Sequence, residues 1–443
     1  MSQLTKGLRF RDLVILGLLF IGPAAPVGLF GVLDAMTDGA VALVYIVATF
    51  VMSFTALSYA RMSRQFPSAG SVYTYASAGI NATAGFLVGW MLLLDYLFIP
   101  SVAFLFSGIS LNSIFPGIPT AVFVVIAIFL ITSLNLMGIK KSVKVTLVIL
   151  IIEVFILLMV LAAGVMLLIQ NGPQRDWLAP FTGGAYFEWK HLFAAVSIAV
   201  LSYLGFDAIA GFAEEAQGNR DAIGKAIISC LLLAGLLFVL QTYIAALISP
   251  DTPEYLRANP KLQNKNYYDI VNNQLGAWLG VSLAIMKGVG AAFAGMVAQA
   301  AASRLLFSMS RDNRLPKMLS KVGKSSGAPK SAILFSAFFS IILAGIAAEQ
   351  ANGLATLVSF VDVGALCAFI MLHISVIGYF NFKITTPYQR SPLLDVIIPI
   401  IGIIVLLPVL LSMKPVAQLV GGIWLLIGIV ILLSKRWINK PSV

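Results

Sequence analysis

The chain has 443 residues, of which 60% are hydrophobic and only 11% are charged, and its formal net charge is +11. A soluble domain carries about 25% charged residues, so the composition excludes an ordinary soluble protein. Apolar runs of membrane-spanning length recur from end to end, and the basic residues lie in the loops between them, where they set membrane topology rather than bind nucleic acid.

The apolar runs predict a bundle of membrane-spanning helices. They are continuous rather than alternating, which favours helices over the strands of a membrane barrel. We therefore expect an all-α integral membrane protein, a single transmembrane domain over 1–443. The expected spans are 12–35, 40–62, 84–108, 119–137, 145–170, 192–213, 224–248, 278–308, 331–348, 352–378, 394–412 and 416–434.

The distribution of basic residues predicts the orientation. Twelve spans put both chain ends on one side, and 22 of the 29 Lys and Arg residues fall in segments on that side, against six on the other. Basic loops favour the cytoplasm, so we expect a multi-pass protein of the cytoplasmic membrane with both termini inside. The first run, 12–35, is too long for a cleaved signal peptide. Segments 63–83 and 249–277 each predict a short helix within a loop.

The first predicted helix is interrupted in mid-span by Ile21, Gly22, Pro23, Ala24 and Ala25, followed by a second proline and glycine. Two prolines remove two backbone donors, and glycines permit unusual dihedral angles. Unwound backbone at this depth is tolerated where it lines a cavity.

The sixth predicted helix carries a second interruption, at Ser202-Tyr203-Leu204-Gly205-Phe206-Asp207. The two broken helices open two five-helix blocks, 12–170 and 192–378, and two further helices follow at 394–434. Breaks at corresponding positions of two repeats predict a transporter's substrate site, the alternative being two packing kinks.

Four motifs resemble those of the amino acid–polyamine–organocation superfamily. They are Phe66-Pro67-Ser68-Ala69-Gly70-Ser71-Val72-Tyr73-Thr74-Tyr75, Gly85-Phe86-Leu87-Val88-Gly89-Trp90, Gly205-Phe206-Asp207 with Glu214-Glu215, and the run from Arg304 to Pro316. The resemblance implies a LeuT-like fold of five plus five inverted helices, with alternating access around a central site.

Within that superfamily, Leu94-Asp95-Tyr96-Leu97-Phe98 and the 66–75 motif look most like the putrescine-importer branch. Many amino acid members have a Gly-Ser-Gly element in the first helix, whose amides hold a carboxylate. Here the element is Gly-Pro-Ala-Ala-Pro, and proline offers no N–H donor, which fits a diamine better. The tail of the sixth helix, Glu214 to Arg220, also departs from the family pattern.

Ionisable groups inside the membrane are costly and point to function. Asp207 follows the second break, where it can pair with a substrate ammonium or cap the half-helix. Phe206 and Tyr203 offer cation–π faces to the same amine, or pack in the core. Asp95 and Tyr96 are expected in a substrate or gating role, or in a structural hydrogen bond.

Glu153 is the predicted proton-coupling residue. The resemblance places it where proton-coupled relatives carry a lysine, and a carboxyl group in an apolar environment can exchange a proton near neutral pH. A salt bridge is the alternative. Sodium coupling is less favoured, although a carboxylate can also ligate a cation. Asp362 and His373 are expected to form a proton relay, or Asp362 lines an outer vestibule or pairs with a neighbour. Lys287 is expected either to snorkel or to pair with an acid.

Other functions lack their motifs. Cys230 and Cys367 lie in apolar runs, which argues against a disulfide framework or a metal site. The sequence contains no phosphate-binding loop of ATPases, no HExxH and no GxSxG, so we expect neither an ATP-driven pump nor an enzyme, and no cofactor beyond an ion gradient.

The prediction is a secondary, proton-coupled importer of small organic amines such as putrescine. The alternative is an amino acid:proton symporter or an amino acid exchanger. Membrane lipid is the other expected partner. The basic run 317–330 is expected to contact anionic lipid. The sequence predicts no oligomeric state.

Overall fold

The computed structural model describes residues 6–115, 117–217, 221–323, 326–350, 353–384, 390–413 and 415–438. Within these residues the regular structure is helical, and the only β-bridge described is a parallel one between Leu8 and Ala216. Ten helices in the described part are long and apolar enough to cross a membrane. The predicted residues 218–220 of the sixth helix's tail and residues 324 and 325 of the basic run lie outside the described part.

The predicted spans correspond to helices of the structure. The unbroken ones are α3 (Val41–Gln65), α5 (Ala82–Ile114), α6 (Thr120–Leu136), α7 (Ile139–Asn171), α10 (Ala222–Ile248), α14 (Ala277–Arg311), α15 (Lys330–Ala348), α16 (Gly353–Gly378), α17 (Ile398–Leu411) and α18 (Pro415–Ile438). The short connecting helices are α4 (Val72–Gly79), α8 (Ala179–Thr182), α11 (Pro253–Ala258), α12 (Pro260–Gln263) and α13 (Asn266–Ile270). Short turns are η4 (Val271–Leu275), η5 (Lys317–Ser320), η6 (Tyr379–Lys383) and η7 (Leu393–Ile397). The short helices expected in 63–83 and 249–277 are thereby confirmed.

Both predicted helix breaks are present. The first span consists of α1 (Phe10–Ile21), η1 (Ala25–Gly28) and α2 (Phe30–Met36). The sixth span consists of α9 (Trp189–Ala199), η2 (Val200–Tyr203) and η3 (Phe206–Phe212). Gly22 and Gly205 lie at the breaks with φ of 78° and 121°, a conformation that other residues rarely adopt.

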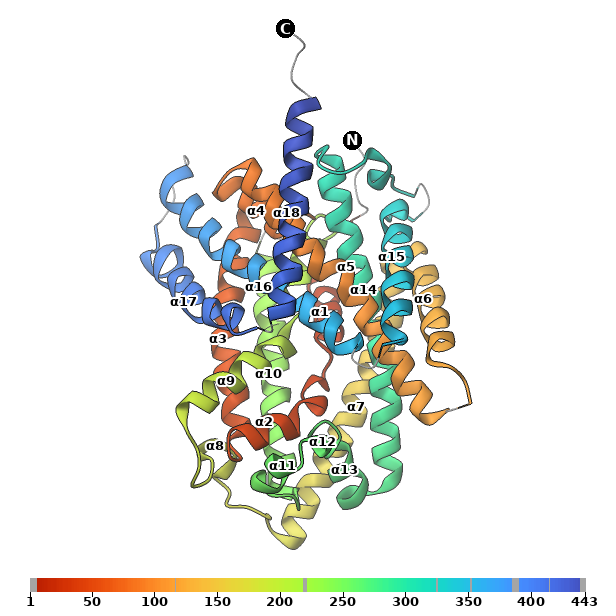
Figure 1. The fold of residues 1–443 in the computed structure, drawn as a ribbon, viewed down its shortest axis with the longest axis vertical. Helices are drawn as coiled ribbons and strands as arrows, with labels where there is room; N and C mark the ends of the chain where they lie inside the picture. The colour runs from red at the N-terminus through yellow and green to blue at the C-terminus, as the bar shows by residue number, and fades with distance from the viewer. Residues whose placement is uncertain are drawn as a thin grey trace.

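The helices run between two distinct ends of the molecule (Figure 1). Helix α1 begins and α18 ends at the same end, which we call the termini end. Helices α2, α8, α11, α12 and α13 gather at the other, which we call the opposite end. The division into two inverted repeats, 12–170 and 192–378, stays a prediction.

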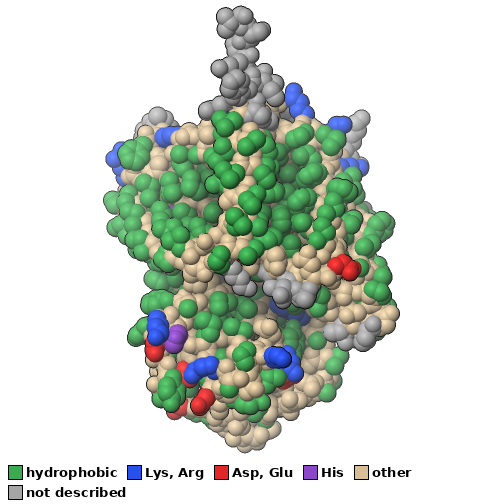
Figure 2. Space-filling view, in the orientation of Figure 1, with side chains coloured by type: hydrophobic (Ala, Val, Ile, Leu, Met, Phe, Trp, Pro, Cys, Tyr) green, Lys and Arg blue, Asp and Glu red, His purple; other side chains and the backbone are tan. Residues whose placement is uncertain are grey.

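The outer surface suits lipid. Figure 2 shows hydrophobic side chains over most of the half toward the termini end, while charged side chains lie mostly at the termini end itself and over the half toward the opposite end. Apolar side chains such as Phe129 on α6 and Ile169 on α7 are more than three-quarters exposed. So large an apolar surface is covered by a membrane in a stable protein, and the chain is a multi-pass membrane protein.

Candidate functional site

The two broken helices touch at their breaks. A Cβ atom added at Gly205 would lie 2.8 Å from Cγ of Phe20 and 3.1 Å from the backbone nitrogen of Ile21. Glycine is therefore required there for the close approach of η3 to α1, as well as for the positive φ. Two interruptions 180 residues apart in sequence thus form one structural feature.

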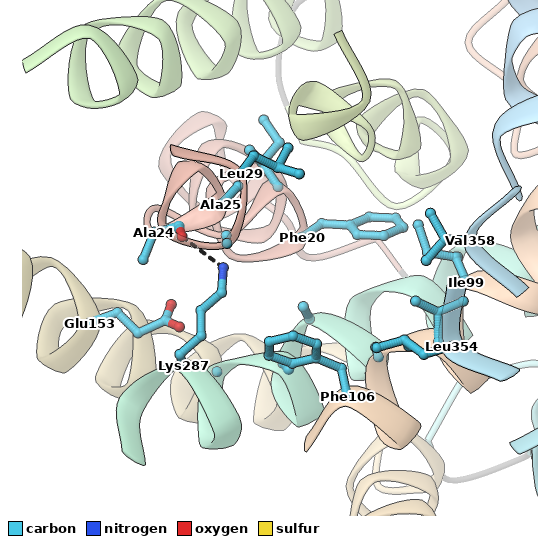
Figure 3. A pocket seen from close by; sticks show the side chains of 18 residues that line it. Phe20, Ala24, Ala25, Leu29, Ile99, Phe106, Glu153, Lys287, Leu354 and Val358 are labelled. Carbon is cyan, nitrogen blue, oxygen red and sulfur yellow. Dashed lines mark hydrogen bonds between the residues drawn. The ribbon is translucent and has the colours of Figure 1, made fainter. Parts of the chain in front are cut away.

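A cavity of about 370 Å³ lies beside this contact (Figure 3). The first break contributes Ile21, Gly22, Ala24 and Ala25 to its wall. The other lining residues come chiefly from α5, α7, α14 and α16, and they include Ile99, Val102, Phe106, Glu153, Lys287, Gly290, Leu354 and Val358. Pro23 does not line the cavity. Its carbonyl oxygen accepts a hydrogen bond of 3.0 Å from the side chain of Gln241.

Lys287 reaches into the first break. Its Nζ atom donates a hydrogen bond of 2.7 Å to the carbonyl oxygen of Ala24. That carbonyl lies in the unwound stretch between α1 and α2, so the lysine supplies a donor that the helix no longer provides. Of the two roles expected for Lys287, snorkelling is not the one seen, because its ammonium group is bonded to Ala24 in the cavity wall.

Glu153 lies next to Lys287, with its carboxyl group directed toward the lysine (Figure 3). The carboxyl group packs against Gly290, where a Cβ atom would collide with it, and its Oε2 atom is buried without a hydrogen-bond partner. No ion pair joins Glu153 to a basic side chain in the described part of the chain. The polar side of the cavity therefore carries one acid and one base held close together, but not hydrogen-bonded to each other.

Asp207 is held in a fixed position just beyond the second break. The hydroxyl group of Tyr96 donates a hydrogen bond of 2.8 Å to its Oδ2 atom, and the backbone N–H of Gly205 donates one of 3.2 Å to Oδ1. The side chain is 1% exposed. The Gly205 bond is the local, capping-type role that the sequence left open, and the Tyr96 bond connects η3 to α5.

Two further buried acids extend from Asp207, Asp95 next to it and Asp362 next to Asp95. Asp95 on α5 and Asp362 on α16 are 3% and 4% exposed, and Asp95 is within electrostatic range of both Asp207 and Asp362. Among the described residues, no lysine or arginine forms an ion pair with any of the three. Three carboxyl groups without a resident cation are an arrangement that a cationic ligand or protons must neutralise.

The aromatic candidates lie outside the cavity lining. Tyr203 bonds through its hydroxyl group to Thr49 at 2.6 Å and packs against Phe238. Phe206 packs against Tyr59 and Phe369, with ring centroids 6.1 and 6.0 Å away. These contacts are the core packing that the sequence left as the alternative to cation–π binding.

The predicted relay between Asp362 and His373 has no direct hydrogen bond. The ring nitrogens of His373 lie 2.9 Å from Ser58 Oγ and 3.3 Å from Thr55 Oγ1, both on α3. Spacing along one helix put His373 near the face of Asp362, but the neighbouring helix α3 supplies the partners. We therefore leave His373 out of the site.

A polar network that the sequence did not reveal lies at the termini end. Glu215 forms a buried ion pair with Arg304, and Glu214 forms a two-pronged ion pair with Arg311 at 2.7 and 2.9 Å. The segment before α1 joins them, since the amides of Gly7 and Leu8 donate to the Glu215 carbonyl oxygen. The Glu-Glu pair was recognised as a motif, but its arginine partners are about 90 residues away in sequence.

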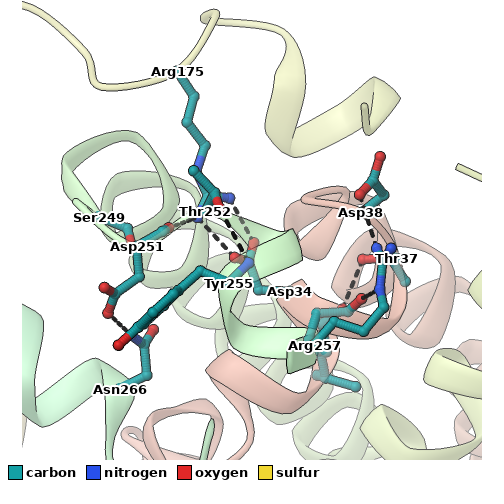
Figure 4. Close-up of polar contacts among 12 residues, drawn as sticks. Asp34, Thr37, Asp38, Arg175, Ser249, Asp251, Thr252, Tyr255, Arg257 and Asn266 are labelled. Carbon is teal, nitrogen blue, oxygen red and sulfur yellow. Dashed lines mark hydrogen bonds and ion pairs between the residues drawn. The ribbon is translucent and has the colours of Figure 1, made fainter. Parts of the chain in front are cut away.

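A second polar network lies at the opposite end (Figure 4). Arg175 forms two hydrogen bonds of 2.8 Å with Asp34, at the end of the broken first span, and a third of 2.7 Å with the Asp251 carbonyl oxygen. Arg257 pairs with Asp38 at 2.8 Å. The first network therefore ties the end of the sixth span to α14 and to the segment before α1, and the second ties the end of the first span to two loops.

Comparisons with known proteins agree on one family. The family model described as Amino acid permease matches residues 13–433. The chain is 30% identical to the low-affinity putrescine importer PlaP of Escherichia coli, covering 97% of this chain and 93% of the relative. It is 27% identical to the branched-chain amino acid permease BcaP of Bacillus subtilis, with the same coverage. It is also 27% identical to a methylthioribose transporter of Bacillus subtilis, covering 96% of this chain and 92% of the relative.

Proposed function

The chain belongs to the amino acid permease family, and from that premise we propose that it is a secondary active importer of small organic amines such as putrescine. Membership makes it a transporter of small amines or amino acids, not an enzyme. The observation that carries the choice of an amine is Asp207: a buried carboxylate, held by Tyr96 and Gly205 beside the contact of the two breaks, with no basic partner among the described residues. A substrate ammonium is its natural counter-ion, because opposite charges attract strongly when both lose water.

The proposed coupling ion is the proton, and the proposed coupling residue is Glu153. Its Oε2 atom lacks a hydrogen-bond partner, and Lys287 lies beside it in the same cavity. Binding or loss of a proton at Glu153 changes its attraction for Lys287, and Lys287 holds the first break through Ala24. A proton can in this way bias the geometry of the broken helix that borders the substrate site.

We propose that the protein crosses the cytoplasmic membrane and that its termini end lies in the cytoplasm. The excess of Lys and Arg in the segments on that side supports it. A reporter enzyme active only in the cytoplasm, fused after the last residue, is expected to be active. Activity from a reporter that works only outside would reverse the orientation.

The test is transport by the purified protein in liposomes. We expect accumulation of radiolabelled putrescine under an inward proton gradient without sodium, and competition by unlabelled diamines. The variant Asp207→Asn is expected to abolish uptake, whereas Glu254→Gln, an exposed carboxyl-to-amide change on α11, is expected to leave uptake unchanged. Failure of wild-type protein to take up putrescine would refute the amine assignment.

Glu153→Gln separates coupling from binding. We expect this variant to exchange internal for external putrescine but to lose accumulation driven by the proton gradient. Undiminished accumulation in Glu153→Gln would remove Glu153 from the mechanism. A requirement for sodium in the wild-type protein would replace the proton as the coupling ion.

An amino acid substrate is the second candidate, and Lys287 is the observation that favours it. A cation bonded to the first break can attract a substrate carboxylate to the place where proline has removed backbone donors. Uptake of an α-amino acid with no competition by diamines would select this alternative. The charge of Lys287 is already opposed by Glu153, which is why we place the amine first.

A further inference from the structure

Asp95 on α5 and Asp362 on α16 lie in electrostatic range of each other, where the two helices pack together. A Cβ atom added at Gly364, two residues after Asp362, would lie 2.6 Å from the backbone nitrogen of Asp95. The two helices therefore approach to backbone contact at Asp95. Such close packing fixes α5 and α16, and with them the two acids, relative to each other.

The pair lies one helical turn beyond the cavity wall, toward the termini end. Ile99 lines the cavity four residues after Asp95, and Val358 lines it four residues before Asp362. Residues four apart share a helix face, so both acids continue the cavity-facing sides of α5 and α16. Figure 3 shows Ile99 and Val358 adjacent at the apolar side of the cavity, opposite Glu153 and Lys287.

The polar groups at this place lack partners. Oδ1 of Asp95 is buried without a hydrogen bond, whereas both oxygens of Asp207 accept one. The hydroxyl group of Tyr59 on α3 is also fully buried. It makes no hydrogen bond of normal geometry, although Ser71 lies next to it, and it is in electrostatic range of Asp207 and Asp95. Buried polar atoms are almost always satisfied, so an unsatisfied acceptor and an unsatisfied hydroxyl in the same electrostatic environment indicate a ligand group that completes them.

We propose that Asp95 and Asp362 form a second ammonium subsite, which takes the far nitrogen of a diamine whose near nitrogen is held by Asp207. A primary ammonium has three N–H donors and no acceptor, which matches two carboxyl groups and a hydroxyl group. The apolar side chains of Phe20, Ile99 and Val358 supply a surface for the methylene groups between the nitrogens. This inference rests on the proposed amine function and adds to it that the site selects substrates with two positive charges.

The experiment compares two ligands that differ by one nitrogen. Equilibrium binding of putrescine and of n-butylamine is measured by competition on the full-length purified protein. Wild-type protein is expected to prefer putrescine. The variant Asp362→Asn, which keeps the shape of the side chain, is expected to weaken putrescine binding at least about tenfold, or about 1.4 kcal/mol, and to leave n-butylamine within about twofold.

Two further variants make the result specific. Asp362→Glu retains the charge on a longer side chain, and we expect it to keep a preference for diamines but shift it toward 1,3-diaminopropane. Glu254→Gln is the carboxyl-to-amide control and is expected to bind both ligands as wild type does. Retained n-butylamine binding in Asp362→Asn also shows that the variant is folded.

The outcomes separate this inference from the proposed function. If wild-type protein binds putrescine and Asp362→Asn changes both ligands equally, or neither, the second subsite is refuted while the amine function stands. If wild-type protein binds no amine, the proposed function fails and the subsite fails with it. Equal wild-type affinity for putrescine and n-butylamine also overturns the subsite.

Discussion

The ammonium group of Lys287 on α14 donates a 2.7 Å hydrogen bond to the carbonyl oxygen of Ala24, in the unwound stretch between α1 and α2. A break in a membrane helix leaves backbone carbonyls that must find donors, since lipid provides none. Here the donor is a charged side chain, and the same side chain lies beside the carboxyl group of Glu153. The geometry of the broken helix is thereby linked to a pair of ionisable groups.

Replacement of Lys287 by methionine is expected to abolish accumulation of substrate. Lys287→Met retains the length of the side chain but leaves the Ala24 carbonyl without its donor, at a cost of about 1–3 kcal/mol, and leaves Glu153 without a neighbouring cation. Uptake in liposomes and the thermal unfolding midpoint are the measurements. Lys265→Met, an exposed change in the loop of the opposite end, is the control. Wild-type uptake by Lys287→Met would show that the bond is incidental.

Substitution of Gly205 by alanine is expected to destabilise the contact between the two breaks. The added Cβ atom would meet the ring of Phe20, and the φ of 121° is unfavourable for alanine, so we expect a loss of about 1–3 kcal/mol together with transport. Gly345→Ala on α15 is a matched control, because nothing lies within 4 Å of its added Cβ atom. Equal unfolding midpoints for the two variants would contradict the close approach described above.

Removal of either partner of the Asp34–Arg175 pair is expected to be strongly destabilising. Asp34 is fully buried and the arginine is 11% exposed, so a lone charge would remain in the interior at a cost of about 3–5 kcal/mol. Thermal unfolding of Asp34→Asn and Arg175→Gln in detergent measures the loss. Lys190→Gln, which breaks an exposed pair with Glu188, is expected to change little. A small effect from the buried pair would mean that water reaches this network.

The ion pair of Glu214 predicts a pH dependence at the termini end. Burial raises the pKa of this carboxyl group, but hydrogen bonds from Arg311 and the backbone N–H of Ala69 outweigh burial and hold the pKa below its ordinary value. A lowered pKa in the folded state contributes stability above the unfolded value, about 4.3, and that contribution is lost as the pH falls through the folded value.

The corresponding measurement compares unfolding midpoints of wild type and Glu214→Gln between pH 7 and pH 3. We expect wild type to be the more stable at pH 7, and the difference to shrink as the carboxyl group becomes protonated in the acid range. Glu349→Gln, an exposed carboxyl change, is expected to show no such convergence. A difference that is constant with pH would assign the stability to packing rather than to charge.

Trp90 on α5 and Trp424 on α18 predict how the last helix is attached. Each indole Nε1 atom donates a 2.7 Å hydrogen bond to the other residue's carbonyl oxygen, and the rings stack with centroids 4.9 Å apart. Trp424→Phe removes one bond, and we expect a loss of about 1–3 kcal/mol in thermal stability. Trp278→Phe, at a side chain 61% exposed, is the control and is expected to be neutral. Equal stability of the two variants would show that α18 is held by other contacts.

The sequence by itself determined the helical membrane fold and the places where two helices break. Continuous apolar runs in lipid leave the backbone no alternative to helix, and Pro23, Gly22 and Gly205 act on their own backbone, so these features are local. The acids Asp95, Glu153, Asp207 and Asp362 were also visible, because a charge in an apolar run stands out whatever surrounds it.

The tertiary structure alone decided which of these groups meet. Lys287 bonds to Ala24 from 263 positions away, and Arg175 bonds to Asp34 from 141, and no spacing along the chain encodes either contact. Tyr203 and Phe206 looked equally suited to a substrate face until neighbouring helices enclosed them in the core. Local sequence specifies where the backbone breaks and where charge enters the membrane, but packing between distant helices specifies each charge's partner.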